Sequence, residues 1–344
     1  MSKEHKATTP IIGISCGDVN GIGPEVIMKV LSDDRMNKQC TTVIYGSGKV
    51  FSYYRKLIKA SRFNYTQIDS LQNIRHKKVN LLNVAKDEIE VKAGQITPEA
   101  GQLAFESLKQ AATDLKEKKI DALVTAPINK DNIQNDTFKF PGHTEFFTAL
   151  SEKKESLMLM TSEDLKIGMI TGHVPVSHIK DRITKELIIL KSEILNHSLK
   201  KDFGIQKPKI AILGLNPHAG ENGLLGSEEK EIIEPAIEEL KNKNILAFGP
   251  LSADGFFGSL QFKNYDGVIA MYHDQGLIPF KTLAFEKGVN YTAGLPFVRT
   301  SPDHGTAYDI AGRGIADETS FREAIFTAID IVKNREQASD HSVR

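Results

Sequence analysis

The stretch TPEAGQLAFESLKQAATDLKEKKIDALVTAP, residues 97–127, decides the fold class. Thr97 is suited to cap a helix, with Pro98 at the first helical position and Glu99 in the first turn. Apolar residues then recur near one helical face: Leu103, Leu108, Ala112 and Leu115. Residues 120–127 have the continuous apolar character of a buried strand. The stretch therefore predicts a helix leading into a strand, the repeating unit of a largely parallel sheet covered by helices.

The same alternation extends along the chain. Further strand candidates are residues 11–16, 42–46, 210–214 and 268–272, and residues 24–31 resemble a helix with Pro24 at its first position. One interruption differs: residues 157–160 and 167–170 flank a polar turn at 162–164, which predicts an antiparallel hairpin. We therefore predict an α/β fold whose sheet is mixed but largely parallel.

Size and charge narrow the class of protein. A chain of 344 residues suggests two domains. Its 40% hydrophobic and 26% charged residues and its mean hydropathy of −0.27 are values of a globular protein. Lys+Arg and Asp+Glu are both 44, so the net charge is 44 − 44 = 0. Because a large nucleic-acid footprint needs a basic excess, we expect no nucleic-acid partner.

The cysteines and the N-terminus indicate the cellular compartment of the protein. Cys16 and Cys40 are too few for a disulfide framework and fit a reducing compartment. The N-terminal residues are charged, and no signal-peptide core follows them. No apolar run approaches the ~20 residues that span a bilayer. We expect a cytoplasmic protein that does not interact with membranes.

Three strand candidates end in loops that contain a histidine beside Gly or Pro: His173, His218 and His273. In open α/β sheets, ligands bind beyond the carboxyl ends of the strands. Three imidazoles can hold zinc or a related divalent cation and leave coordination positions open for a substrate. The spacing is not a compact local motif, so each histidine is also compatible with an ordinary hydrogen-bonding role.

Two glycine-containing turns lead into helices. Gly142 precedes His143 and Thr144, so backbone N–H groups and the Thr144 hydroxyl could bind an anion at a helix N-terminus. The alternative is that Thr144 only caps the helix. Residues 17–24, GDVNGIGP, lack both the G-x-G-x-x-G spacing and a Walker lysine, so they are weak evidence for a nucleotide.

Polar residues also stand out among the Gly, Pro and aromatic residues of 279–314. Lys281 and Arg299 can hold phosphate or carboxylate groups, Arg in a bidentate manner, and Asn290 lies between them in the sequence. Taken singly, a surface Lys or Arg usually serves only solubility, so the cluster rather than any one residue indicates a site.

At these residues the sequence resembles the 4-hydroxythreonine-4-phosphate dehydrogenase family of pyridoxal 5′-phosphate biosynthesis. The segments that carry the resemblance are GDVNGIGPE (17–25), TAPINK (125–130), FPGHTEFF (140–147), TGHVP (171–175), GLNPHAGENGLLG (214–226), ADGFFG (253–258), MYHDQGLIPFK (271–281) and GVNYTAGLPFVRTSPDHGTAYDIAG (288–312). One departure is Val19-Asn20, where many relatives have Pro-Ala. It leaves Asp18 and the glycines of that loop intact.

The resemblance implies a fold and an assembly. The fold would be a two-domain α/β/α arrangement related to isocitrate and isopropylmalate dehydrogenases. Domain 1 is expected at 1–138 plus 305–344 and domain 2 at 139–304. The protein would be a homodimer whose active site lies between the domains and draws on both subunits.

The resemblance also implies roles for individual residues. The metal ligands would be His173, His218 and His273, one of them (His273 is expected) coming from the partner subunit. The substrate-binding residues would be His143, Thr144, Lys281, Asn290 and Arg299. Candidate NAD(P) contacts are Asn216, Gly220 and Gly294, and Asp254 is the candidate general base.

The implied reaction is oxidation of 4-phosphooxy-L-threonine by NAD or NADP with one divalent metal, Zn, Co or Mg. The product, 2-amino-3-oxo-4-phosphooxybutanoate, is a β-keto acid that loses CO2 to give 3-amino-2-oxopropyl phosphate. A cation would stabilise the alkoxide that forms as hydride leaves. Alternatives are a dehydrogenase of 4-phospho-erythronate or 4-phospho-threonate, a three-histidine metal hydrolase, and a non-catalytic sugar-phosphate binder.

Overall fold

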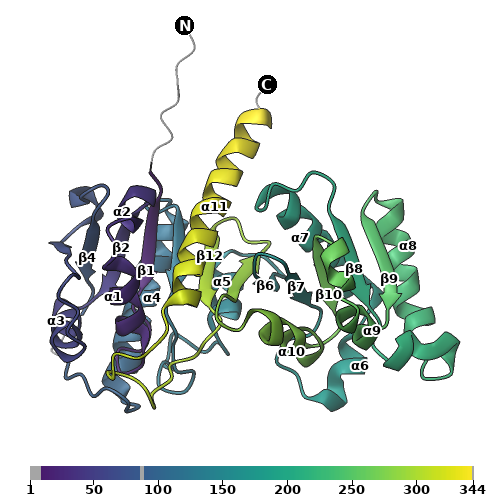
Figure 1. Ribbon diagram of the computed structural model, residues 1–344, viewed down its shortest axis with the longest axis horizontal. Coiled ribbons are helices and arrows are strands. Elements are labelled where there is room, and N and C mark those ends of the chain that lie inside the picture. The colour runs from purple at the N-terminus through teal and green to yellow at the C-terminus, as the bar shows by residue number, and fades with distance from the viewer. Residues whose placement is uncertain (1–8, 86–88, 343–344) are drawn as a thin grey trace, which may run out of the picture. The chain divides into compact units, whose positions relative to one another are not determined.

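The computed structural model describes residues 9–85 and 89–342, with side chains up to Ser339. The chain forms two compact units, which are described separately (Figure 1). Unit 1 consists of the described residues of Met1–Phe147 and Phe297–Val332, and unit 2 of those of Thr148–Pro296 and Lys333–Arg344.

These divisions differ from the boundaries expected at 138/139 and 304/305. Residues 139–147 belong to unit 1 because their aromatic rings pack there: the Phe146 ring lies 5.4 Å from that of Phe138, and the Phe147 ring lies 6.0 Å from that of Phe297. Residues 297–304 join the same unit through strand β12 (Val298–Pro302). The described C-terminal residues from Lys333 onward, expected in domain 1, belong to unit 2.

The sheet of unit 1 has the strand order β3-β4-β2-β1-β5-β12, and all of its neighbouring strands are parallel. Its strands are β1 (Ile11–Ser15), β2 (Thr41–Gly46), β3 (Thr66–Ile68), β4 (Val79–Asn83), β5 (Ala122–Thr125) and β12 (Val298–Pro302). The buried strand predicted after the helix of residues 97–116 is β5, and all four of its residues are buried.

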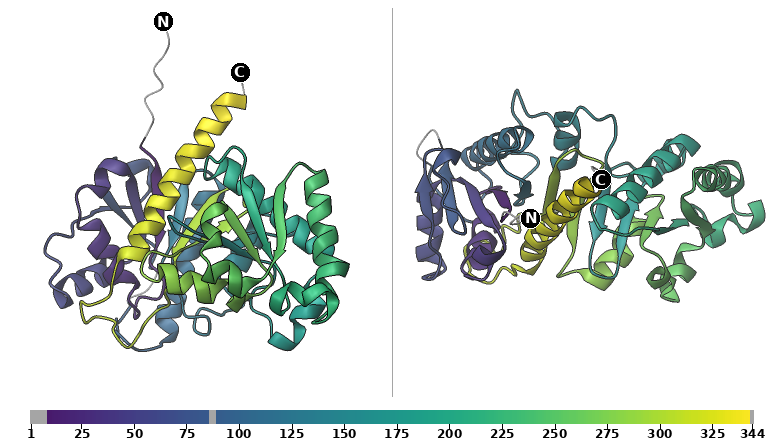
Figure 2. Two further views of the ribbon diagram at one scale, coloured as in Figure 1. Left: turned by 45° about the vertical axis from the view of Figure 1, so that its right-hand side comes forward. Right: turned by 90° about the horizontal axis from the view of Figure 1, so that it is seen from above.

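Helices cover both faces of this sheet, α1 in front and α4 behind in Figure 1 (Figure 2, right). The helices are α1 (Gly23–Leu31), α2 (Met36–Gln39), α3 (Gly48–Leu57), η1 (Leu71–Asn73) and α4 (Pro98–Lys116), while α5 (His143–Leu150) and α11 (Thr319–Ser342) begin in this unit. The predicted cap is confirmed, because Thr97 Oγ1 accepts a hydrogen bond from Ala100 N at 3.2 Å. Gly101 is required because a Cβ there would lie 2.0 Å from Asn132 O.

The sheet of unit 2 has the order β11-β6-β7-β10-β8-β9. Its strands are β6 (Leu157–Thr161), β7 (Lys166–Met169), β8 (Lys209–Leu213), β9 (Leu246–Leu251), β10 (Gly267–Ala270) and β11 (Val289–Ala293). The pairs β11–β6 and β6–β7 are antiparallel, and the others are parallel. The predicted hairpin and the predicted mixed, largely parallel sheet are therefore confirmed.

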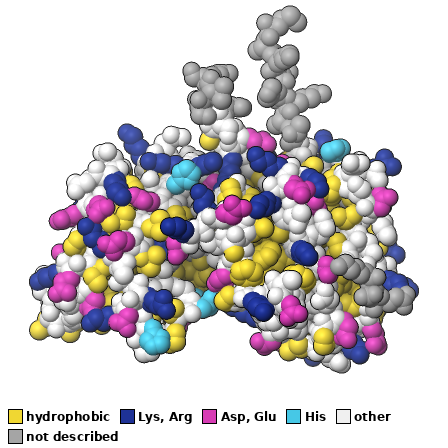
Figure 3. Space-filling view, turned by 180° about the vertical axis from the view of Figure 1, so that it is seen from behind, with side chains coloured by type: hydrophobic (Ala, Val, Ile, Leu, Met, Phe, Trp, Pro, Cys, Tyr) yellow, Lys and Arg dark blue, Asp and Glu magenta, His cyan; other side chains and the backbone are white. Residues whose placement is uncertain are grey.

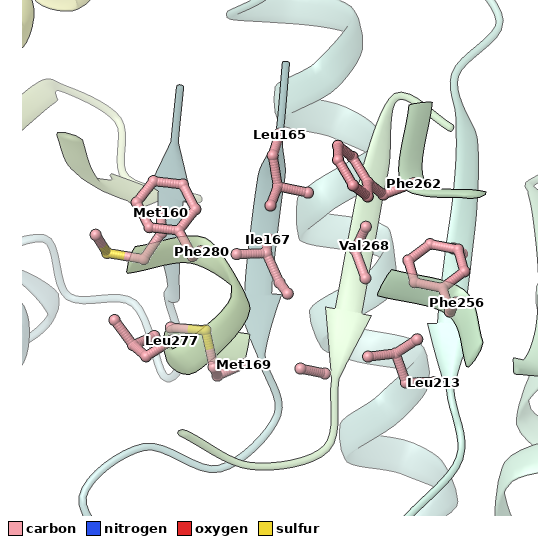
Figure 4. Close-up of a cluster of buried hydrophobic side chains, with 12 residues drawn as sticks. Met160, Leu165, Ile167, Met169, Leu213, Phe256, Phe262, Val268, Leu277 and Phe280 are labelled. Carbon is pink, nitrogen blue, oxygen red and sulfur yellow. The ribbon is translucent and has the colours of Figure 1, made fainter. Parts of the chain in front are cut away.

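The helical segments of unit 2 are η2 (Val176–His178), α6 (Ile179–Arg182), α7 (Lys185–Lys201), η3 (Pro217–Gly223), η4 (Glu229–Ile233), α8 (Glu234–Asn242), α9 (Ala253–Gly258), η5 (Gln261–Asn264) and α10 (His273–Ala284). One face of the sheet packs on α7, since a Cβ on Gly267 would lie 2.9 Å from Leu199 Cδ1. On the other face Val268 joins a buried apolar cluster with Leu277 and Phe280 of α10 (Figure 4). This core fixes α10, and with it the loop that precedes the helix.

The surface carries both signs of charge. On the face shown in Figure 3, Lys and Arg side chains are intermingled with Asp and Glu. Among the residues that the structure describes, no helix combines the length and the apolar character needed to cross a bilayer.

Candidate active site

Two of the three predicted metal-binding histidines meet at the carboxyl ends of neighbouring strands of unit 2. Strands β7 and β10 are parallel, and their contact continues past the last paired residues. Met271 O accepts hydrogen bonds from both the amide (3.2 Å) and the hydroxyl (2.9 Å) of Thr171. His173 and His273 each follow within two residues, and their ring centroids are 5.5 Å apart.

Gln275 ties the strand ends together. Its side-chain oxygen accepts a hydrogen bond from Met271 N at 2.7 Å, and its nitrogen donates to Gly214 O at 2.7 Å. Gly214 directly follows β8, the strand whose loop carries His218. One amide therefore fixes the exits of β10 and β8 relative to each other.

The second ring nitrogen of His273 has a carboxylate neighbour, since Nδ1 lies 2.7 Å from Asp274 Oδ1. Such a partner orients an imidazole and raises its basicity as a metal ligand. His173 and His273 therefore fit two ligands of one cation. Within the described residues of one chain, however, no group of three His, Cys, Asp or Glu side chains could hold a metal ion. The predicted three-histidine set is thus incomplete in a single chain.

His218 begins an unusual loop in which residues 218–222 all have positive φ angles, from 41 to 77°. Glu229, which is only 2% exposed, supports this loop. Its Oε1 accepts hydrogen bonds from Leu215 N and Asn216 N, both at 2.8 Å. A Cβ on Gly220 would lie 2.5 Å from Glu229 Oε2, so glycine is required where the loop passes the carboxylate. A left-handed run of this length persists only when its surroundings hold it.

The structure brings His218 near Asp254, the candidate general base. Ser252 Oγ donates to Asp254 Oδ1 at 2.6 Å in the first turn of α9. This bond, the amide of Gly255 and the charge of His218 lower the pKa of Asp254. Asp254 is therefore ionised at neutral pH and able to accept a proton; its role as the base stays a prediction.

In unit 1, Arg299 is the second residue of strand β12. Arg299 pairs with Leu123 of β5, and Thr125 lies two residues farther along that strand on the same face. Thr125 Oγ1 accepts hydrogen bonds from Arg299 Nε (3.1 Å) and Nη2 (2.6 Å). Burial at 1% exposure lowers the pKa of Arg299 to about 9, and the Glu145 carboxylate opposes that shift. The guanidinium thus stays charged at neutral pH, 5.7 Å from the Phe147 ring.

His143 opens helix α5 in the same unit, so Thr144 lies within the first turn rather than before it. The Nε2 atom of His143 is buried and has no hydrogen-bond partner among the described residues. Burial, followed by the charges of Arg299 and Lys130, holds the pKa of His143 well below its usual value. A neutral imidazole with an unsatisfied buried nitrogen is typical of a site that awaits a ligand.

The remaining predicted substrate residues lie in unit 2. Lys281 is on α10, two turns beyond His273, and Asn290 is on β11 opposite Met160. Asn290 Oδ1 is buried and has no hydrogen-bond partner among the described residues. Like His143, this side chain offers a polar atom that no described residue satisfies.

The candidate NAD(P) contacts each have a local structural explanation. Asn216 Nδ2 donates to Glu228 Oε2 at 2.8 Å and to Glu229 Oε2 at 3.0 Å. Gly220 belongs to the left-handed loop, and Gly294 follows β11 with φ +89°. Their contact with the nicotinamide cofactor stays a prediction.

The glycine-rich loop of residues 17–24 is organised by Asp18. The fully buried Asp18 carboxylate accepts hydrogen bonds from Asn20 N (2.9 Å), Asn132 Nδ2 (2.7 Å) and Tyr308 OH (2.8 Å). Gly17 has φ +65°, and a Cβ there would lie 2.3 Å from Pro127 O. These contacts give the loop a structural role, which accounts for Asp18 and Gly17.

The sequence alone did not indicate the residues that position the predicted site residues. Thr125 and Gln275 stand inside segments that carried the family resemblance, TAPINK and MYHDQG, and this was the available signal. Glu229 lies outside every such segment. Only the fold shows that its side chain returns to the loop of His218.

Comparisons with known proteins agree with the motifs. The family model described as "Pyridoxal phosphate biosynthetic protein PdxA" matches residues 38–328. The chain is 50% identical to the 4-hydroxythreonine-4-phosphate dehydrogenase of Bacteroides thetaiotaomicron, covering 95% of this chain and 90% of the relative. It is 38% identical to the D-threonate 4-phosphate dehydrogenase of Cupriavidus necator, covering 95% and 98%.

The fold has a close counterpart among solved structures. The crystal structure of 4-hydroxythreonine-4-phosphate dehydrogenase from Klebsiella pneumoniae superposes with a TM-score of 0.83 at 35% identity, covering 95% of this chain and 99% of that one. The resemblance inferred from the motifs is thereby confirmed. The chain belongs to the PdxA family of pyridoxal phosphate biosynthetic proteins.

Proposed function

We propose that the protein oxidises 4-phosphooxy-L-threonine with NAD+ or NADP+ as one step of pyridoxal 5′-phosphate biosynthesis. The secondary alcohol becomes a ketone, hydride passes to the nicotinamide, and the hydroxyl proton is released. The resulting β-keto acid then loses CO2 to give 3-amino-2-oxopropyl phosphate. We also propose that the reaction takes place in the cytoplasm, where the buried thiols of Cys16 and Cys40 suit a reducing environment.

The observation that carries this proposal is the adjacency of His173 and His273. Their 5.5 Å ring separation arises from the pairing of two parallel strands, so it is built into the fold. Two imidazoles, one of them oriented by a carboxylate, suit Zn or Co, and Mg is the weaker match because it prefers oxygen ligands. The cation, when bound, supplies Lewis acidity for removing the hydroxyl proton and for the decarboxylation.

The chain's own residues bind and orient the substrate. Arg299 and Lys281 offer positive charge to its anionic groups, and His143 and Asn290 offer buried polar atoms that lack partners in the described chain. Fixing the substrate in this way removes translational and rotational freedom before hydride transfer. Asp254 is the candidate acceptor of the hydroxyl proton.

We further propose a homodimer in which the partner completes the metal site. Large apolar side chains lie exposed near each histidine: Val176 (84%) after His173, Leu224 (78%) in the His218 loop, and Ile278 (64%) on the helix that begins at His273. Exposed apolar surface of this kind suits a protein interface. Because His173 and His273 already meet in one chain, this pairing favours His218, rather than the expected His273, as the partner's ligand.

Mixed dimers of inactive variants test this assignment. If His218 crosses the interface, a heterodimer of H173A and H218A subunits keeps one intact site and regains activity. A heterodimer of H173A and H273A subunits then has no intact site. The reverse pattern would assign His273 to the partner.

The reaction itself is tested by NAD(P)H formation from 4-phosphooxy-L-threonine, with NAD+ or NADP+ and with or without a chelator. We expect turnover that chelation abolishes and added divalent metal restores. D-threonate 4-phosphate is the second candidate substrate, because a relative of this name matches almost the whole chain. A higher kcat/KM on it would reassign the substrate. Phosphate release without NAD(P)H would instead indicate a hydrolase.

A further inference from the structure

We propose that Lys130 is a further substrate-binding residue, which together with His143, Thr144 and Arg299 holds the phosphate group of the substrate at the first turn of α5. All four residues belong to unit 1. The inference rests on the proposed function for the identity of the substrate, but the binding of a phosphate dianion can be measured independently.

The side chain of Lys130 extends to the start of α5. A Cβ on Gly142, the residue before the helix, would lie 3.8 Å from Lys130 Cε. The ammonium group is attached to that carbon, so it lies beside the helix N-terminus. Its charge also contributes to the lowered pKa of His143, whose Nε2 atom is buried. Lys130 therefore acts on the same point as Arg299, although the two residues are far apart in the sequence.

The backbone of Lys130 is fixed while its charge stays available. Lys130 O accepts a hydrogen bond from Gln134 Nε2 at 3.0 Å, and Asn129 Oδ1 accepts from the amide of Asp131 at 2.9 Å, which closes the turn. No ion pair involves Lys130 in the part of the chain that the structure describes. Glu145 Oε2 lies 3.3 Å from the same Gly142 Cβ position, and its charge also acts on Arg299.

A count of charges shows why this lysine matters. A phosphate monoester carries about −1.5 to −2 at neutral pH. Among the groups that act on His143 and Arg299, Arg299 contributes +1, Glu145 contributes −1, and His143 is neutral. Without Lys130 these charges cancel, and with it the net charge is +1. Lys130 therefore turns an electrically balanced group of side chains into one that attracts a dianion.

The test uses the full chain with Lys130→Met, Lys130→Arg and the control Lys139→Met, which removes an exposed lysine from the same loop. We expect Lys130→Met to raise KM for 4-phosphooxy-L-threonine about 10- to 100-fold, as for loss of a charge-assisted hydrogen bond. Its kcat should change little, and its KM for unphosphorylated 4-hydroxy-L-threonine should stay the same. Lys130→Arg should recover most of the loss, and Lys139→Met should behave as the wild type. An unchanged KM in Lys130→Met would overturn the inference.

Inorganic phosphate separates this inference from the proposed function. Millimolar phosphate should raise the melting temperature of the wild type and of Lys139→Met, and raise that of Lys130→Met much less. If the wild type failed to oxidise the substrate but showed this difference, the function would be wrong and the anion site correct. Equal stabilisation of all variants by phosphate would overturn the role of Lys130.

Discussion

The Thr125 hydroxyl accepts two hydrogen bonds from the Arg299 guanidinium, one from Nε at 3.1 Å and one from Nη2 at 2.6 Å. The two residues lie on neighbouring parallel strands, β5 and β12, whose register sets their separation. A neutral acceptor fixes the orientation of the guanidinium without cancelling its charge. A carboxylate in place of the Thr125 hydroxyl would add a second negative charge to that of Glu145, which already acts on Arg299.

Removing the Thr125 hydroxyl should affect both stability and binding. Thr125→Val keeps the shape but leaves donors of the buried Arg299 unsatisfied, which we expect to reduce the free energy of unfolding by about 1–3 kcal/mol. The KM for 4-phosphooxy-L-threonine should also rise, because the guanidinium loses its fixed orientation. Urea unfolding and steady-state kinetics provide the measurements. Thr125→Ser retains the acceptor and should resemble the wild type; a Val variant with wild-type properties would show that the bond is unimportant.

Loss of the guanidinium itself should chiefly weaken substrate binding. Arg299→Ala is expected to raise KM for the phosphorylated substrate at least tenfold, about the effect of one charge-assisted hydrogen bond. Circular dichroism establishes that the variant is folded, since it also removes a buried side chain. A folded variant with an unchanged KM would remove Arg299 from the substrate site.

His143 should make stability depend on pH. Its folded-state pKa lies well below the value of about 6.5 that applies in the unfolded chain. Below pH 6.5 the unfolded state therefore binds a proton that the folded state does not. Stability should fall as the pH is lowered from 6.5 toward 5, by at most about 1.4 kcal/mol per pH unit from this group.

Urea midpoints between pH 8 and 5 measure this dependence. His143→Gln should show a shallower decline than the wild type over the acidic part of the range. His197→Gln, which changes an exposed histidine on α7, is the matched control and should decline as the wild type does. Parallel curves for the wild type and His143→Gln would contradict the lowered pKa of His143.

Glu229 should influence metal binding without touching the metal. Glu229→Gln replaces an acceptor oxygen by a donor in the loop that carries His218, and we expect metal affinity to fall about tenfold, as for other residues that position ligands. Titration of the metal-free protein with Zn or Co measures the affinity. Glu231→Gln, an exposed neighbour, should leave it unchanged. Identical affinities for both variants would mean that the loop does not depend on this carboxylate.

The elements that local sequence governs were predictable. Thr97 and Pro98 start α4, and the polar turn at 162–164 joins two antiparallel strands, because capping and turn chemistry act over a few residues. The adjacency of His173 and His273 follows from parallel strand order, which the sequence suggested only through the repeated position of a histidine after a strand.

Features that depend on distant contacts were not predictable. The left-handed run after Pro217 contains only one glycine in residues 218–222, so its composition does not predict its backbone conformation. Glu229, which supports the run, belongs to another element. The compact units are divided at positions other than the expected domain boundaries for a similar reason. Packing of Phe147 on Phe297 joins segments about 150 residues apart, and no composition change marks either one.

The most direct test of the account is the metal content and turnover of purified His218→Ala. His218 lies in an exposed loop, so circular dichroism should show a folded protein. We predict that the variant retains little divalent metal and forms no NAD(P)H from 4-phosphooxy-L-threonine, while a His197→Ala control keeps both. A folded His218→Ala variant that turns over the substrate at the wild-type rate without bound metal would contradict the proposed chemistry.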